Sequence, residues 1–226
     1  MSVRQALVPA DVLPHAETCI GFVNTAGWHA SDHPVELLTS YGRLTGWARE
    51  HGLLSAAQAS LLEQRARWEP AAAARVLTEA ITLREAAYRI LTALAVGRAP
   101  RDADVTRLNR SLTHALRHLR LAPGPVGLGY AWGGAPDALD RMLWPLACAT
   151  AGLLTSADAR QVGMCANHPC GWLFIDRSHG RTRRWCDMSS CGNRTKVRRH
   201  YARSKSQAPA QEGQASSTPG NGPCPP

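Results

Sequence analysis

Four cysteines in the C-terminal third of the chain have the residue type and the spacing of a metal site. They are Cys165, Cys170, Cys186 and Cys191, and they form two C-x4-C pairs. Two thiolate pairs on two tight turns can converge on one tetrahedral centre, and Zn²⁺ suits four soft thiolates. Four thiolates leave no open coordination position, and the spacing is not that of a C-x-x-C redox pair. We therefore expect one structural Zn²⁺.

The residues around the cysteines predict the elements that hold them. Residues 172–175 read as a strand, and the residues up to Trp185 read as the returning strand of a hairpin. The residues after Gly192 contain neither Gly nor Pro and predict a helix, with Asn193 as a candidate N-cap. A helix that starts near Cys191 would favour its thiolate through the helix dipole. The order turn, hairpin, turn, helix is that of a treble-clef-like zinc finger.

Positive charge is concentrated in the same part of the chain. Residues 165–205 carry ten Lys and Arg against two Asp, a net +8, whereas residues 1–164 carry +2 and residues 206–226 carry −1. So dense a basic segment predicts a polyanionic partner. Arginine binds phosphate bidentately and reads guanine edges, so a short Arg-rich helix suits the major groove of DNA. The predicted contact residues are Arg181, Arg183, Arg184, Arg194, Lys196, Arg198, Arg199 and Arg203.

Some of these residue types also have explanations without nucleic acid. Asn193 fits an N-cap, and Arg194 fits a structural contact with a backbone carbonyl or an aspartate of the finger. Val197 and Tyr201 are expected to pack back on the hairpin. A solvated basic face without a specific partner is the remaining alternative.

The residues before the cysteines predict a helical body. Apolar residues recur at helical spacing in the stretches 15–27, 34–52, 55–69, 70–97 and 101–119. We expect Pro34 to be the first residue of one helix and Ser55 the N-cap of the next. A Pro/Gly turn between apolar runs predicts a β-hairpin at 119–134. A last helix, 136–156, contains Pro145, which is expected to kink or break it.

The fold class is therefore mainly α with a small β-hairpin: an N-terminal helical domain followed by a treble-clef-like zinc finger. The expected division is an extended N-terminus at 1–14, the helical domain at 15–160, the finger at 161–205 and a disordered tail at 206–226. The sequence has no run of 18 apolar residues, so no transmembrane helix is expected. The first residues also lack the apolar core of a secretory signal, so we expect a cytoplasmic protein.

The helical body has no catalytic motif. It contains no G-x-S-x-G, Walker loop, dinucleotide-binding G-x-G-x-x-G or H-E-x-x-H, so we do not expect an enzyme. Polar residues within its apolar stretches could line a small-molecule pocket with aromatic walls. The candidate pocket residues are Asn24, Arg84, Trp132 and Trp144. The alternative is a satisfied polar network inside a helical core.

The cysteine segment resembles the CGNR zinc fingers. The name-giving residues are Cys191, Gly192, Asn193 and Arg194, and "CGWLFIDRS", "RRWC" and "CGNRTKVRRHYAR" are also similar. The residues before the finger resemble the ABATE domain, which precedes this type of finger. The similar stretches are "GFVNTAGW", "LLTSYGRLTGWAREHGLL", "LREAAYRILTALAVGRAP" and "LLTSADARQVGMCANHPCGW". The resemblance covers roughly residues 17–203. It implies a bacterial, stress-linked transcription regulator with a zinc-binding C-terminal module.

These features together predict a zinc-dependent transcription regulator that binds DNA. With a ligand pocket in its body, it would be a one-component regulator that senses a ligand or a stress and binds DNA with its finger. Two alternatives stay open. One is an RNA-binding or ribosome-associated zinc module, because a basic treble-clef unit serves RNA equally well. The other is a protein-interaction adaptor whose zinc is purely structural.

Overall fold

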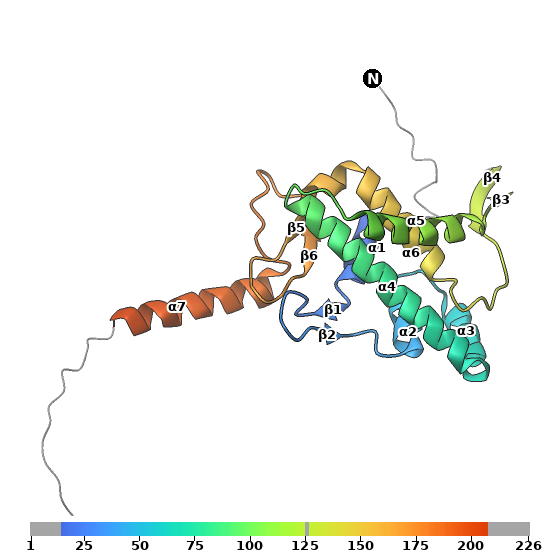
Figure 1. Cartoon of the computed structure of the whole chain (residues 1–226), viewed down its shortest axis with the longest axis horizontal. Helices are drawn as coiled ribbons and strands as arrows, with labels where there is room; N and C mark the ends of the chain where they lie inside the picture. Colours follow the sequence, from blue (N-terminus) through green and yellow to red (C-terminus); the bar gives the residue numbers. More distant parts are fainter. Residues whose placement is uncertain (1–14, 125–126, 208–226) are drawn as a thin grey trace, which may run out of the picture.

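The computed structural model describes residues 15–124 and 127–207. It shows a helical body from which the last helix, α7 (Asn193–Gln207), projects (Figure 1). The side chains of Arg199, His200, Ala202 and residues 204–207 fall outside the described part. The predictions for residues 1–14 and for the tail beyond Gln207 also concern residues outside it.

The described residues are mainly helical, as predicted, and contain three two-stranded antiparallel sheets. The elements of the body are α1 (Ala16–Val23), β1 (Ala26–Gly27), β2 (Val35–Glu36), α2 (Tyr41–Glu50), α3 (Ala56–Trp68), α4 (Pro70–Ala95), α5 (Asp102–Leu116), β3 (Leu119–Pro123), β4 (Leu128–Trp132) and α6 (Leu143–Thr155). A 3-10 turn (Ala157–Gln161), β5 (Val162–Met164), β6 (Leu173–Ile175), a π-helical turn (Met188–Gly192) and α7 follow.

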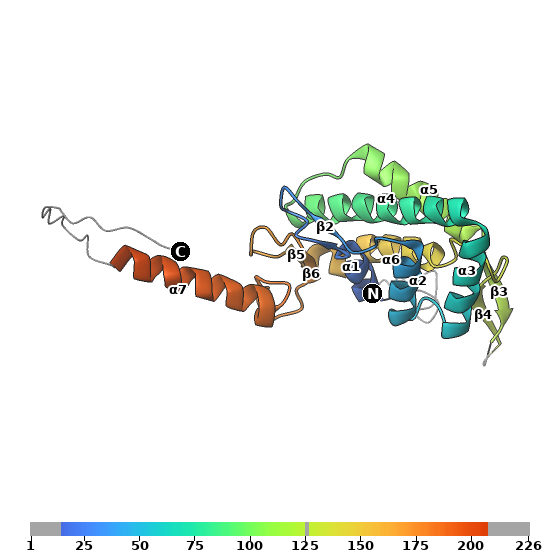
Figure 2. The same cartoon turned by 90° about the horizontal axis from the view of Figure 1, so that it is seen from below.

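The long helix α4 organises the core of the body. It contacts α1, α2, α3, α5 and α6 (Figures 1 and 2). Its buried residues recur at helical spacing, as the sequence predicts: Ala80, Leu83, Ala87, Ile90 and Leu91. The amphipathic pattern of one helix therefore decides which of its faces the other helices cover.

A capping box starts α3 where the sequence predicts. The Ser55 hydroxyl accepts the backbone N–H of Gln58 (3.2 Å), and the Gln58 side chain accepts the N–H of Ser55 (2.8 Å). Two N–H groups that have no partner inside the helix are satisfied in this way. Glu69 separates α3 from α4, and Pro70 is the first residue of α4, where its missing N–H costs nothing.

The prediction that a helix starts at Pro34 is wrong. The residues after Pro34 form β2, which pairs with β1, and α2 starts only at Tyr41. The hydroxyl of Ser40 accepts an N–H of the first turn of α2 (3.2 Å). The stretch 34–52 thus offers two possible helix starts, and the one with a capping side chain forms the helix.

Pro145 does not kink the last helix of the body. α6 starts at Leu143, later than the predicted 136, so Pro145 lies in its first turn. The N–H groups of a first turn have no acceptor within the helix, so proline removes no hydrogen bond there. The proline is therefore compatible with a regular helix at this position.

The two predicted hairpins have different outcomes. β3 and β4 form the expected antiparallel hairpin. In the finger, β6 pairs with β5, which precedes the first cysteine pair, and not with the residues up to Trp185. The carboxylate of Asp176 accepts the N–H groups of Ser178 and Arg183 (2.9 Å each) and closes the chain after β6 into a compact loop. This loop takes the place of the predicted returning strand.

Candidate metal centre and nucleic-acid interface

The four predicted ligands come together. Possible ligand atoms of Cys165, Cys170, Cys186 and Cys191 all lie within 4.8 Å of one another, and the sulfurs of Cys170 and Cys186 are 3.7 Å apart. Zn–S bonds of about 2.3 Å in a tetrahedron place the sulfurs roughly 3.8 Å apart, so this donor set fits zinc. Cys186 is half-buried and the other three are buried, as in a closed structural site.

Burial makes two of these sulfurs hold their protons tightly, so a metal must displace those protons to bind. Burial raises the pKa of the Cys170 thiol to about 11 and raises the pKa of Cys186 as well. Burial also acts to raise the pKa of Cys191, but hydrogen bonds from Asn167 and the other thiols outweigh it and lower the value. The buried Asn167 donates its Nδ2–H to the Cys191 sulfur (3.3 Å). A bound Zn²⁺ replaces the protons and allows four thiolates in one buried cluster.

The turn that carries Cys191 leads directly into α7. Gly192 allows a close approach, because a Cβ there would lie 2.4 Å from the sulfur of Met188. The prediction that Asn193 is the N-cap is wrong, since its backbone is already helical. Its Nδ2–H donates instead to the carbonyl of Ser189 (3.0 Å). Asn193 therefore ties the first turn of α7 to the zinc-binding turn.

The finger is attached to the body through the stretch that contains Asn24. The side chain of Asn24 accepts the N–H of Leu173 and donates to its carbonyl, both at 2.9 Å, as a neighbouring strand would. The indole N–H of Trp172 donates to the carbonyl of Ala26 (2.8 Å). Asn24, a predicted pocket residue, thus lies at the seam between the body and the finger.

The same seam is closely packed on both sides of Leu173. The Tyr88 hydroxyl on α4 donates to the carbonyl of Gly171 (2.8 Å). Gly171 has φ +70°, and a Cβ there would lie 2.5 Å from the backbone nitrogen of Ala30. Leu173 and Ile175 of β6 pack into an apolar cluster with side chains from α1, α4 and α6. The body and the finger therefore share a core cluster.

The predicted nucleic-acid residues between the two cysteine pairs are exposed, but each has a contact within the chain. Arg183 donates to three backbone carbonyls of the finger, and its guanidinium carbon lies 4.6 Å from the ring centroid of Phe174. Arg181 donates to a carbonyl of the 3-10 turn (3.3 Å). Arg184 lies 5.8 Å from a tryptophan ring centroid. Of these three arginines, Arg183 therefore makes the most contacts within the finger.

The predicted residues of α7 divide between two faces of the helix. The Arg194 guanidinium carbon lies 4.8 Å from the ring centroid of Trp28 on the body. Arg198 donates to a carbonyl of the first cysteine turn (3.4 Å). Lys196 and Arg203 are exposed and lie two turns apart on the other face. The body-facing residues anchor α7, and Lys196 and Arg203 on the other face are exposed.

Three expectations about α7 have distinct outcomes. Val197 and Tyr201 are not buried against the finger, because they are 54% and 70% exposed along a helix that projects from the body (Figure 1). Arg194 has a structural contact, but its partner is an aromatic ring of the body. The side chain of Arg199 lies outside the described residues.

A satisfied polar network surrounds another predicted pocket residue, Arg84. Its side chain is 3% exposed, and its guanidinium pairs bidentately with Glu36 (2.7 Å twice) and also binds Glu85. Burial acts to raise the pKa of Glu85, but hydrogen bonds from His29 and Arg84 lower it to about 2. Arg84 also donates to the Thr25 hydroxyl (3.3 Å). The network leaves Arg84 with internal partners rather than an open site.

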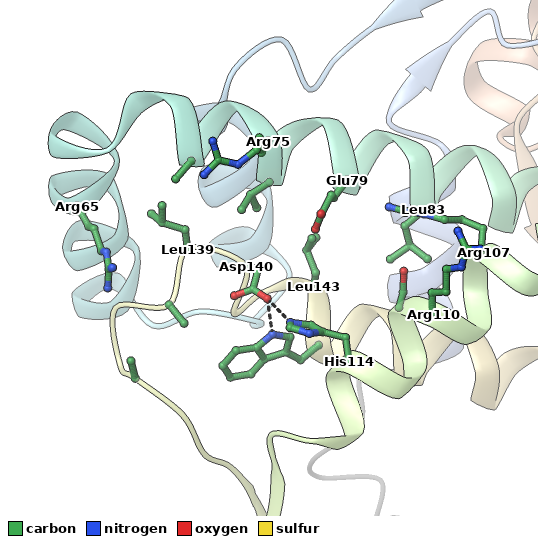
Figure 3. A pocket seen from close by; sticks show the side chains of 16 residues that line it. Arg65, Arg75, Glu79, Leu83, Arg107, Arg110, His114, Leu139, Asp140 and Leu143 are labelled. Carbon is green, nitrogen blue, oxygen red and sulfur yellow. Dashed lines mark hydrogen bonds and ion pairs between the residues drawn. The ribbon is translucent and has the colours of Figure 1, made fainter.

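The two predicted tryptophans lie elsewhere in the body. The ring centroids of Trp132 and Trp144 are 6.3 Å apart. Trp144 lines a cavity between α4, α5 and the segment before α6 (Figure 3). Arg75, Arg107 and Arg110 also line this cavity, and the sequence analysis did not single them out. They lie on two helices at positions that read as ordinary solvated helix surface, so no local signal marks them.

Comparisons with known families agree with this geometry. Residues 16–157 match the ABATE family, which is described as "Putative stress-induced transcription regulator". Residues 161–204 match the CGNR zinc finger. No match was found among curated proteins. No helix within 15–124 or 127–207 has both the length and the apolar character needed to cross a membrane.

Proposed function

Because the chain belongs to the ABATE family and carries a CGNR zinc finger, we propose that it is a one-component transcription regulator. Its zinc finger binds duplex DNA, and its helical body senses a small molecule or a stress. The observation that carries the DNA-binding half is the position of α7. The helix is anchored at its base by the zinc site, projects from the body and exposes Lys196 and Arg203 (Figures 1 and 2).

The dimensions and charge of α7 suit this role. An α-helix with its side chains is about 10–12 Å wide, and the major groove is about 12 Å wide. Residues 165–205 carry eight of the nine net positive charges of the chain. Cations on an exposed helix face neutralise phosphates and release counterions, which makes binding strong at low salt and weak at high salt.

The path of α4 supports the sensing half. Arg75, Glu79 and Leu83 on this helix line the cavity of the body. Five residues beyond Leu83, Tyr88 of the same helix contacts the finger at Gly171. A change in how α4 packs at the cavity therefore reaches the seam that holds the finger.

A mobility-shift competition over a salt series tests DNA binding. The zinc-loaded full chain is challenged with duplex DNA, structured RNA and heparin. We expect duplex DNA to compete best, and Lys196→Ala/Arg203→Ala to reduce the slope of log affinity against log salt by about 2. The control Arg49→Ala/Arg98→Ala removes two exposed charges from the body and should leave the slope unchanged.

The competition also separates the alternatives. Stronger competition by structured RNA would replace the DNA proposal by an RNA-binding zinc module. No retention of any polyanion at low salt would leave an adaptor whose zinc is structural. Equal loss of slope in both double variants would show that the exposed face of α7 is not the contact surface.

A further inference from the structure

The helical body contains a cavity of the size and character of a small-molecule site. Its volume is about 640 Å³, and it lies between α4, α5 and the segment that leads into α6 (Figure 3). Known ligand sites span roughly 300–1,000 Å³ and have mostly apolar walls with a few polar groups. The apolar lining includes Val76, Leu83, Leu139, Leu143 and Trp144.

Arginines supply the polar part of the lining. Four of them line the cavity: Arg65, Arg75, Arg107 and Arg110. Arg65 is paired with Asp137 (2.7 Å). Among the residues that the structure describes, the other three form no ion pair, and the buried Nε–H of Arg107 has no hydrogen-bond partner. Such a donor gains a partner when an acceptor enters the cavity.

The two acidic residues of the lining, Asp140 and Glu79, neutralise these three arginines only in part. Asp140 binds the indole N–H of Trp144 (2.9 Å) and the Nε2 of His114 (2.6 Å), as the dashed lines of Figure 3 show. Glu79 is directed into the cavity and can accept a hydrogen bond from a hydroxyl or amine of a ligand (Figure 3). Three arginines without an ion pair, against the two carboxylates of Glu79 and Asp140, leave the lining with a net positive charge.

We propose that this cavity binds a small organic acid with a carboxylate or phosphate head and a flat apolar body. The head is held by Arg107 and Arg110, which lie together at one end of the cavity (Figure 3). A guanidinium matches both anions bidentately. The apolar body lies against Trp144 and the leucines. The inference names the site and ligand class for the sensing half of the proposed function and rests on it.

Two fluorescent probes that differ in one charged group test the proposal. The anionic probe is 1-anilinonaphthalene-8-sulfonate, and the neutral probe is N-phenyl-1-naphthylamine, which has the same rings without the sulfonate. Both are titrated into the zinc-loaded full chain without DNA. We expect the anionic probe to bind more tightly, and Arg107→Ala/Arg110→Ala to weaken it by about tenfold or more. Binding of the neutral probe should change little.

The control Arg49→Ala/Arg98→Ala loses the same charge outside the cavity and should bind the anionic probe as the wild type does. Displacement by benzoate and by phenyl phosphate then identifies the preferred head. Displacement by neither acid would overturn the proposal. Unchanged binding by the Arg107→Ala/Arg110→Ala variant, with both proteins folded by circular dichroism, would also overturn it.

The two proposals fail separately because the probe titration contains no DNA. Loss of the mobility shift with intact probe binding contradicts only the DNA-binding half of the proposed function. A normal mobility shift without the arginine-dependent probe site contradicts only the cavity assignment.

Discussion

Asn24 makes a contact on which the attachment of the zinc finger depends. An amide both accepts and donates, and both functions are used on the backbone of Leu173, at 2.9 Å each. A carboxylate of the same size offers only acceptors when ionised, so it would face the Leu173 carbonyl without a proton. An asparagine is therefore suited to position 24 because its amide can donate and accept at once, and not only because it is polar.

The substitution Asn24→Asp tests that role. It removes one hydrogen bond and places a charge beside a carbonyl oxygen, so the free energy of unfolding should fall by about 1–3 kcal/mol. Urea denaturation of the zinc-loaded chain measures the change. Asn109→Asp, on the exposed face of α5, is the matched control and should stay within about 0.5 kcal/mol of the wild type. Equal stability of both variants would contradict the role of Asn24.

Single residues could be predicted from the sequence where a local pattern defines their chemistry. The four cysteines are such a case, because the paired C-x4-C spacing itself indicates a metal site. Asn24 is the opposite case, because its partner Leu173 is 149 residues away. Arg194 likewise has a ring of the distant Trp28 as its partner. A polar residue in an apolar stretch indicates a buried contact but does not say whether a ligand or a backbone makes it.

Elements could be predicted where their own side chains decide their ends. Ser55 starts α3 through a local capping box, and a Pro/Gly turn folds the hairpin of β3 and β4. The predicted helix start at Pro34 is wrong because the residues after it pair with β1 as a strand. The predicted pairing of β6 with the residues up to Trp185 is wrong because Asp176 closes the residues after β6 into a loop. Both errors come from tertiary contacts that override a local pattern.

The turn that leads into β6 gives a test at this scale. Gly171 has φ +70°, and a Cβ there would lie 2.5 Å from the backbone nitrogen of Ala30. Gly46 lies within α2 and has open space around the same position. Gly171→Ala should therefore lower the free energy of unfolding by about 2 kcal/mol or more. Gly46→Ala should raise it by up to about 1 kcal/mol.

Thermal or urea unfolding of the two glycine variants measures this difference. The same chemical change should have opposite signs at the two positions. A loss of stability at Gly46 similar to that at Gly171 would contradict the explanation, because it would show that added side-chain bulk is harmful everywhere.

In the whole molecule, the zinc finger is part of the folded body. β6 contributes to a core cluster with α1, α4 and α6. Outside that cluster, Arg177 of the finger is ion-paired with Asp158 (2.7 Å) and with Glu17 of α1. Zinc binds the folded state, so its binding free energy stabilises everything that folds together with the finger. The metal therefore also stabilises the contacts between α4 and the finger, and α7 continues from that finger.

Removal of zinc should accordingly loosen α1 as well as the finger. We expect one zinc per chain by metal analysis and none in Cys191→Ser. The control Cys224→Ser, which changes a cysteine that is not one of the four predicted ligands, should keep one zinc. Amide hydrogen exchange after chelation should rise in α1 and β6, and much less in α3, which makes no contact with the apolar cluster of the seam. If the finger unfolds while hydrogen exchange in α1 stays unchanged, the finger folds independently of the body. A signal from the cavity would then have no packed path to α7, and the one-component mechanism would need another route.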